Sequence, residues 1–235
     1  MTSKQRDGTN TKQGAKTSNV INIFTGKDIR YASNPIIRIA PELDALEMLY
    51  SNTSNPEKLY SLKICCWALR KNGEIQGMVP WLNELMPCTE INDPLDGHWQ
   101  GYRDPIRNEI FYHAPEYKVA ELEASAAHFC KKNCDAITEQ TIPDNIGTHA
   151  ALTCDGFKTL TLIELHSWHL NAAGKVSGLF VNHKGINSSP ILIGDKSLTE
   201  AQSHPDFKYF FQHRMANKIK NQDPDAMAAI SLLID

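Results

Sequence analysis

The hydrophobic pattern of this chain is dominated by two pairs of short apolar runs, each pair divided by a glycine-containing turn sequence. Residues 62–81 hold the first pair on either side of an Asn-Gly dipeptide at 72–73, which is the strongest short signal for a two-residue β-hairpin turn. Residues 159–183 hold the second pair around an Ala-Gly dipeptide at 173–174. The pattern therefore predicts two β-hairpins, and the apolar run at 189–193 predicts a further strand.

The two predicted hairpins share the sequence pattern W-x-L-x3-G-x-[IV]-x-G. Its five matched positions are Trp67/Trp168, Leu69/Leu170, Gly73/Gly174, Ile75/Val176 and Gly77/Gly178. Unrelated hairpins share turn glycines and apolar strand residues for ordinary reasons, which explains three of the five matches but less easily the tryptophan and the second glycine. The alternative is an internal duplication, in which residues 36–135 and 136–235 form two similar halves.

Other regions carry apolar residues at the spacing typical of amphipathic helices. Leucines three residues apart predict a short helix over 41–50, and an apolar stripe followed by two lysines predicts a longer helix over 115–133. Near the C-terminus, a Ser-x-x-Glu capping box at 197–200 precedes apolar stripes over 207–219 and 223–235. Together, the hairpins and helices predict the α+β class, with both hairpins in one antiparallel sheet and the helices packed on one side.

Two regions lack these periodic patterns. Residues 1–19 are polar, with nothing to bury, and predict a disordered tail followed by an edge strand at 20–24. Residues 87–115 contain four prolines and several glycines, which predict a long, polar, aromatic-rich loop. Because structureless loops of this length are usually functional or mobile, this loop is a candidate region for a site. The rest of the chain, 20–235, is predicted to form a single α+β domain.

Composition narrows the class of protein without identifying an activity. The 235 residues include 24 basic and 27 acidic side chains, for a net charge of -3, and 41% of them are hydrophobic. A sizeable core is therefore expected, and a nucleic-acid-binding surface is not. No stretch resembles a signal peptide or the apolar run of a membrane span. We therefore expect a soluble cytoplasmic protein whose six cysteines are reduced thiols.

The second predicted hairpin contains one carboxylate and two imidazoles that fall on one strand face if its loop has two residues. Antiparallel pairing then places Glu164 opposite His183 and His166 opposite Val181, with opposite Cβ atoms about 5 Å apart. Two histidines and one carboxylate form a ligand set used by catalytic zinc and by non-haem iron. Glu164, His166 and His183 are therefore a candidate catalytic and divalent-metal site. The alternative is an exposed ion pair, and a loop one residue longer would remove the cluster.

A second candidate site lies in the loop predicted for 87–115. Its candidate ligand-binding residues are His98, Trp99, Tyr102, Arg103, Asp104, Arg107 and His113. Aromatic rings among charged groups can stack a sugar or a base, and Arg103 and Arg107 can hold a phosphate or carboxylate through paired hydrogen bonds. The alternative is that Trp99 and Tyr102 anchor the loop to the core while the arginines pair with nearby aspartates.

Motifs for well-known chemistries are missing from the sequence. It contains no nucleophile elbow, phosphate-binding glycine loop or dinucleotide-binding fingerprint, so ATP-driven and nicotinamide-dependent activities lack their usual support. We expect a cytosolic module that binds a small molecule or a protein partner, without nucleic acid or membrane. The alternative is a metal-assisted hydrolase or related enzyme that uses Glu164, His166 and His183 with a divalent metal as cofactor. A purely structural or interaction protein is a third interpretation.

Overall fold

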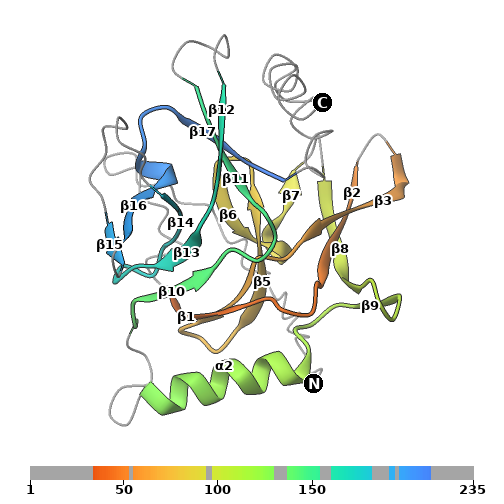
Figure 1. Ribbon diagram of the computed structural model, residues 1–235. Coiled ribbons are helices and arrows are strands. Elements are labelled where there is room, and N and C mark those ends of the chain that lie inside the picture. The colour runs from red at the N-terminus through yellow and green to blue at the C-terminus, as the bar shows by residue number, and fades with distance from the viewer. Residues whose placement is uncertain are drawn as a thin grey trace, which may run out of the picture. The chain divides into compact units, whose positions relative to one another are not determined.

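The computed structural model describes residues 34–52, 55–93, 97–129, 137–153, 160–181, 191–193 and 196–212. The chain divides into two compact units, Met1–Ser33 and Asn34–Asp235, and all of the described residues belong to the second unit. These residues form mostly β-strands, which are arranged as four small antiparallel sheets like the blades of a four-bladed propeller (Figure 1).

Two of the sheets are built from the first half of the described residues. In spatial order, one contains β1 (Ile36–Pro41), β4 (Cys66–Arg70), β5 (Ile75–Trp81) and β6 (Glu84–Pro87). The other contains β3 (Asn55–Lys63), β2 (Glu47–Asn52), β8 (Gly97–Asp104) and β7 (Asn92–Asp93), with β9 (Glu109–Phe111) also paired to β8. The short 3-10 helix η1 (Cys88–Glu90) joins β6 to β7.

The other two sheets are built from the second half. One contains β10 (Gln140–Pro143), β13 (Ser167–Leu170), β14 (Val176–Val181), β16 (Lys196–Glu200) and β15 (Ile191–Ile193) in spatial order. The other contains β12 (Thr161–Glu164), β11 (His149–Leu152) and β17 (Phe207–Phe211). The 3-10 helix η2 (Ala201–Ser203) lies between β16 and β17 in the chain.

The strands of the two halves are connected in the same order. β4 lies between β1 and β5, as β13 lies between β10 and β14. β2 lies between β3 and β8, as β11 lies between β12 and β17. In each half a 3-10 helix follows the strand that pairs with the second strand of the hairpin, β6 in the first half and β16 in the second. The described parts of the two halves therefore share a strand order, and the division at 36–135 and 136–235 and its origin in a duplication remain predictions.

Both predicted hairpins are present, but they lie in different sheets. β4 pairs with β5 so that Trp67 faces Gly77, and β13 pairs with β14 so that Trp168 faces Gly178. Both tryptophans are 0% exposed. The prediction of a shared sheet is wrong, because β4 and β5 bond to β1 and β6 whereas β13 and β14 bond to β10 and β16.

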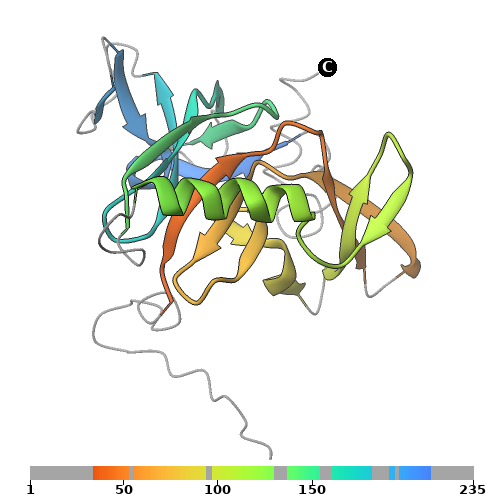
Figure 2. The same ribbon diagram turned by 90° about the horizontal axis from the view of Figure 1, so that it is seen from below.

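The predicted α+β class, with helices packed on one side of a sheet, is also wrong. In the part of the chain that the structure describes, α2 (Glu116–Phe129) is the single α-helix, and it agrees with the helix predicted over 115–133. It packs against β1 and β4, and Figure 2 shows it crossing β1. No helix among the described residues is long and apolar enough to cross a membrane.

The helix predicted over 41–50 is largely strand β2. Residues 46–50 are all buried, and β2 lies between β3 and β8 at the centre of its sheet. A strand covered on both faces carries a continuous apolar run, and spacing alone does not distinguish such a run from a buried helix. Leu43, which contributed to the helical spacing, is 69% exposed and lies outside the strand.

The C-terminal helices were also mispredicted where the structure describes them. The expected capping box at 197–200 is part of β16, and the first five residues of the expected helix over 207–219 form β17. The aromatic side chains of β17 favour a strand, and the helical spacing masked this preference. The tail at 1–19, the strand at 20–24 and the helix at 223–235 lie outside the described residues.

The proline-rich region 87–115 is not a long loop, because β8 runs through its centre and bonds to β2, β7 and β9. Pro87 ends β6, Pro105 lies in the β8–β9 turn and Pro115 precedes α2, whereas Pro94 lies outside the described residues. A β-bulge interrupts the pairing of β2 with β8 near Gly101, whose φ is +127°. Glycine is the residue that accommodates such a backbone conformation without a steric penalty.

The hydrophobic core consists of two buried clusters, one around Trp67 and the other around Trp168. The cluster around Trp168 includes Ile36 and Met78 from the first half, and the cluster around Trp67 includes Phe211 from the second half. The two halves therefore share their buried surface.

Candidate functional site

A pocket of about 390 Å³ lies beside the turn that connects β5 to β6. It is lined by Trp81, Leu82, Asn83, Glu84, Met86, Glu90, Ile91 and Asn92. These residues follow one another from the end of β5, through the turn, β6 and η1, to the start of β7. One continuous segment, 81–92, therefore provides all of the described lining.

The floor of the pocket is apolar and well supported. Trp81 is 5% exposed and packs edge-on against Tyr50, with ring centroids 5.3 Å apart and an interplanar angle of 90°. Gly97 makes this packing possible, because a Cβ atom there would lie 2.8 Å from Cδ2 of Tyr50. Ile91 is buried, and Met86 is half-buried against the core around Trp67.

The β5–β6 turn holds a strained backbone at the pocket wall. Leu82 has a φ of +57°, a left-handed conformation that costs a residue with a side chain roughly 1–2 kcal/mol. Its carbonyl oxygen accepts a hydrogen bond from the backbone N–H of Phe210 at 2.7 Å. Since Phe210 belongs to β17, the second half of the molecule holds the turn of the first half in place. Residues kept in such conformations often occur at ligand-binding sites.

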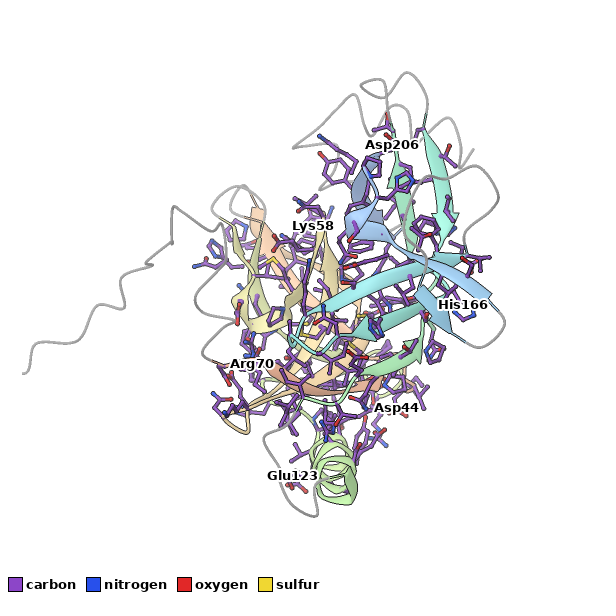
Figure 3. The ribbon with its side chains drawn as sticks, turned by 90° about the vertical axis from the view of Figure 1, so that its left-hand side faces the viewer. Asp44, Lys58, Arg70, Glu123, His166 and Asp206 are labelled. Atoms are coloured by element: carbon purple, nitrogen blue, oxygen red, sulfur yellow. The ribbon has the colours of Figure 1, made fainter. Side chains whose placement is uncertain are left out.

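The rim of the pocket is polar, and one of its two carboxylates is neutralised. Glu90 accepts a hydrogen bond from the guanidinium of Arg70 at 2.8 Å. Arg70 is itself buried, its Nε donates to Gln76 at 3.2 Å, and Figure 3 shows it among the strands of the first half. At the other end of the lining, Asn92 Oδ1 is hydrogen bonded to Nδ1 of His98.

The second carboxylate, that of Glu84, has no such partner. Within the described residues, its side chain makes no hydrogen bond and no ion pair, and it is exposed at the rim. Asn83, beside it in the turn, is also exposed and makes no side-chain hydrogen bond to another described residue. The pocket therefore combines an apolar floor with an unpaired negative charge and an amide whose hydrogen-bonding groups are available.

The structure does not form the pairing needed for the predicted metal cluster. β13 pairs with β14 so that Leu170 faces Val176, whereas the cluster required Leu170 to face Ser177. Glu164 belongs to β12, in a different sheet, where it faces His149 of β11. The predicted register is wrong because the turn between β13 and β14 is one residue longer than assumed. In addition, Glu164 cannot belong to this strand, because β13 begins only at Ser167.

His166 lies in the connection between β12, which ends at Glu164, and β13. His166 is exposed, its Nδ1 lies 3.2 Å from the hydroxyl of Ser167, and Figure 3 shows it among the strands of the second half. His183 lies outside the described residues. Among the described residues, no three His, Cys, Asp or Glu side chains are grouped so as to hold a metal ion.

The aromatic residues of the second predicted site face the core. Tyr102 is 1% exposed, and its hydroxyl accepts a hydrogen bond from the backbone N–H of Gly77 at 3.1 Å. Burial is the main cause that raises the pKa of the Tyr102 hydroxyl far above its ordinary value. Trp99 packs edge-on against Tyr102 at 5.6 Å. This arrangement corresponds to the alternative in which the two rings anchor the segment.

The charged residues of that site are held within the β8–β9 hairpin. Arg103 donates to Asn108 at 3.0 Å, and Asp104 accepts the backbone N–H of Arg107 at 3.0 Å. The Nε atom of Arg107 lies 3.7 Å from the other Asp104 oxygen, and His113 is exposed beyond β9. Of the seven predicted residues, His98 is the one whose side chain bonds to a residue of the pocket.

The pocket at 81–92 was not predicted from the sequence. The Leu-Asn pair at 82–83 is not a typical two-residue hairpin turn, because a leucine with positive φ is unusual. A weak signal existed, since an asparagine between the apolar runs of β5 and β6 favours a turn. When the chain is compared with known proteins, no protein-family model, curated protein or solved structure matches it. The site therefore cannot be identified by similarity.

Proposed function

We propose that this protein is a cytosolic binding module for a small ligand and that the pocket at 81–92 is its binding site. The pocket itself carries the proposal. Its volume of about 390 Å³ lies within the range of roughly 300–1,000 Å³ that is typical of small-molecule sites. Its apolar floor and few polar rim groups also match the usual composition of such sites.

The cytosolic part of the proposal is supported by the cysteines. Cys65, Cys66 and Cys88 are buried free thiols, and free thiols are typical of reducing compartments. Burial is the largest cause that raises the pKa of Cys65 and of Cys88 well above the ordinary value of 9.0. A raised pKa disfavours the reactive thiolate, so Cys65 and Cys88 suit a structural role in the core.

Fragment screening by NMR on the full chain tests the proposed site. The sequence has four tryptophans, so the indole N–H of Trp81 can be followed beside that of Trp168, which lies in the other core cluster. We expect bound fragments to shift the Trp81 signal and leave the Trp168 signal in place. Fragments that shift only signals far from 81–92 would contradict the proposed site.

Variants that fill the pocket with a larger side chain test whether fragments bind there. Met86→Trp places a larger side chain in the pocket, and Asn83→Trp does so from the exposed rim, where the fold is less affected. Ile106→Trp is the control, because Ile106 is 84% exposed in the β8–β9 turn and does not line the pocket. Fragment binding is expected to be lost in the first two variants and kept in the third.

A further inference from the structure

We propose that the ligand of this pocket is an aliphatic primary ammonium ion, whose carbon chain lies on the apolar floor and whose ammonium group binds at Glu84. This inference rests on the proposed function, since it names the class of ligand for the same site. It follows from three properties of the lining: its charge, its hydrogen-bonding groups and its aromatic content.

The charge of the lining favours a cation. Among the described residues that line the pocket, the charged side chains are the carboxylates of Glu84 and Glu90. Arg70 neutralises Glu90 at 2.8 Å, which leaves the Glu84 carboxylate as the unbalanced charge. A cation bound beside Glu84 balances that charge, whereas an anion there is repelled by it.

The hydrogen-bonding groups of the rim suit a ligand that only donates. An ammonium group has three N–H donors and no acceptor. The Glu84 carboxylate can accept two of these hydrogen bonds, and the adjacent amide oxygen of Asn83 can accept another. Hydrogen bonds between an ionised donor and an ionised acceptor are the strongest of their kind. The oxygen of Asn92 is already bonded to His98, so binding is expected at the Glu84 side of the rim.

The aromatic content of the lining distinguishes a primary ammonium from a quaternary one. Quaternary ammonium groups are recognised by cages of several aromatic faces. Among the described lining residues Trp81 alone is aromatic, and it is 5% exposed with Tyr50 packed edge-on against it. The floor therefore offers apolar contact to a carbon chain, and the charge of the ligand must be bound through hydrogen bonds at the rim.

Three probes with six carbon atoms each test the inference: n-hexylammonium, 1-hexanol and hexanoate. Each is titrated into the full chain and followed through the Trp81 indole signal. We expect hexylammonium to bind most tightly, hexanol more weakly and hexanoate not at all. Shortening the chain to propylammonium is expected to weaken binding by up to about fourfold for each buried methylene lost. The advantage of hexylammonium over hexanol should shrink in 1 M salt, because the screening length falls to about 3 Å.

The variant Glu84→Gln removes the charge and keeps the shape of the rim. It is expected to weaken hexylammonium binding about three- to fivefold, as for the loss of an exposed ion pair, and to weaken hexanol binding less, because a hydroxyl can also donate to the glutamine oxygen. Glu57→Gln is the matched control, because Glu57 is exposed on β3 and does not line the pocket. This control is expected to bind both probes as the wild type does.

The outcomes separate the two proposals. If hexanol or hexanoate binds as tightly as hexylammonium, or if Glu84→Gln has no effect, the pocket binds ligands but the ammonium inference is wrong. If none of the probes shifts the Trp81 signal and the fragment screen also finds no ligand there, both proposals are wrong. If trimethylhexylammonium binds more tightly than hexylammonium, hydrogen bonding at the rim does not determine the ligand class.

Discussion

The indole N–H of Trp168 donates a hydrogen bond to the carboxylate of Asp144 at 2.8 Å. Trp67 makes the equivalent bond to Glu42 in the first half of the molecule. In both halves the same carboxylate also accepts the backbone N–H four residues further along the chain, from Thr148 at 2.8 Å and from Leu46 at 3.4 Å. Each carboxylate therefore ties a buried tryptophan to the connection between two sheets.

Removal of either indole N–H is expected to destabilise the fold. Trp67→Phe leaves the buried carboxylate of Glu42 without its indole donor, and Trp168→Phe does the same to the half-buried carboxylate of Asp144. We expect each to cost about 1–3 kcal/mol in the free energy of unfolding. Urea denaturation of the two variants measures this cost. Since the two bonds are equivalent, we expect similar values.

Trp99→Phe is the matched control for these two variants. The Nε1 atom of Trp99 is buried and has no hydrogen-bond partner among the described residues, so its replacement removes ring volume without breaking a hydrogen bond to any of them. We expect a loss of about 1 kcal/mol or less. If Trp99→Phe costs as much as Trp168→Phe, ring volume rather than the carboxylate bond determines the stability.

The ionisation of Asp144 is expected to reduce the stability of the fold as the pH rises. Burial is the largest cause that raises the pKa of Asp144 above 3.8, and it outweighs the hydrogen bonds from Thr148 and Trp168, which lower it. Because the pKa is higher in the folded state, this group's stabilising contribution is fully present below pH 3.8 and is lost as the pH rises through the raised pKa.

Asp144→Asn supplies the reference for this effect, because an amide does not titrate. We compare the wild type with the variant through the difference between their free energies of unfolding, wild type minus variant. This difference should be largest below pH 3.8, decrease as the pH rises through the raised pKa, and then become constant. Urea denaturation at a series of pH values measures the difference. A difference that increases with pH would show that the hydrogen bonds to the ionised carboxylate outweigh its burial.

The hairpins could be predicted from sequence because their signals are local. The glycines at 73 and 174 have positive φ values of +87° and +76°, which is the property that their turn sequences indicate. The assignment of the hairpins to two sheets could not be predicted, because it depends on strands that are distant in the chain. β1 was not among the predicted strands, and the aromatic run of β17 was interpreted as a helix.

The surroundings of the candidate sites could not be predicted for a related reason. The cluster of Glu164, His166 and His183 depended on a register that a single residue shifts, and the chain changes sheets between Glu164 and Ser167. The pocket at 81–92 depends on the positive φ of Leu82 and on its bond to Phe210. No residue near Leu82 in the sequence indicates that bond, because its partner lies more than one hundred positions away.

Backbone strain at Ala45 provides a third prediction. Ala45 is exposed and has a φ of +57°, so Ala45→Gly relieves roughly 1–2 kcal/mol of steric cost. The added freedom of glycine in the unfolded chain offsets about 0.5–1 kcal/mol of this. We expect a net increase of up to about 1.5 kcal/mol in the free energy of unfolding, measured by urea denaturation.

Ala173→Gly is the control for this prediction. Ala173 is also exposed in a turn, but its φ is not positive, so glycine adds freedom to the unfolded chain without relieving strain. It is expected to lower the free energy of unfolding by about 0.5–1 kcal/mol. Changes of the same sign in the two variants would contradict this explanation.

The second glycine of the repeated pattern, Gly77 in one hairpin and Gly178 in the other, makes room for an aromatic ring. This packing explains why both hairpins have a glycine at that position, which the turn chemistry of hairpins does not explain. A Cβ atom on Gly178 would lie 2.9 Å from Cε1 of Phe210, and one on Gly77 would lie 2.9 Å from Cε1 of Tyr102. The two rings occupy equivalent places, since Phe210 packs against Trp168 at 5.2 Å and Tyr102 packs against Trp67 at 5.0 Å.

Gly178→Ala is therefore expected to destabilise the fold by about 1–3 kcal/mol through overpacking. In a Phe210→Leu background the ring is gone, so the same substitution should cost about 1 kcal/mol less. Gly147→Ala is the control, because Gly147 has a φ of +71° and open space around it, so its cost arises from the backbone and should not depend on Phe210. Double-mutant cycles by urea denaturation measure the coupling of Gly178→Ala and of Gly147→Ala to Phe210→Leu. If the two coupling energies are equal, the cost at Gly178 does not arise from direct contact with the Phe210 ring.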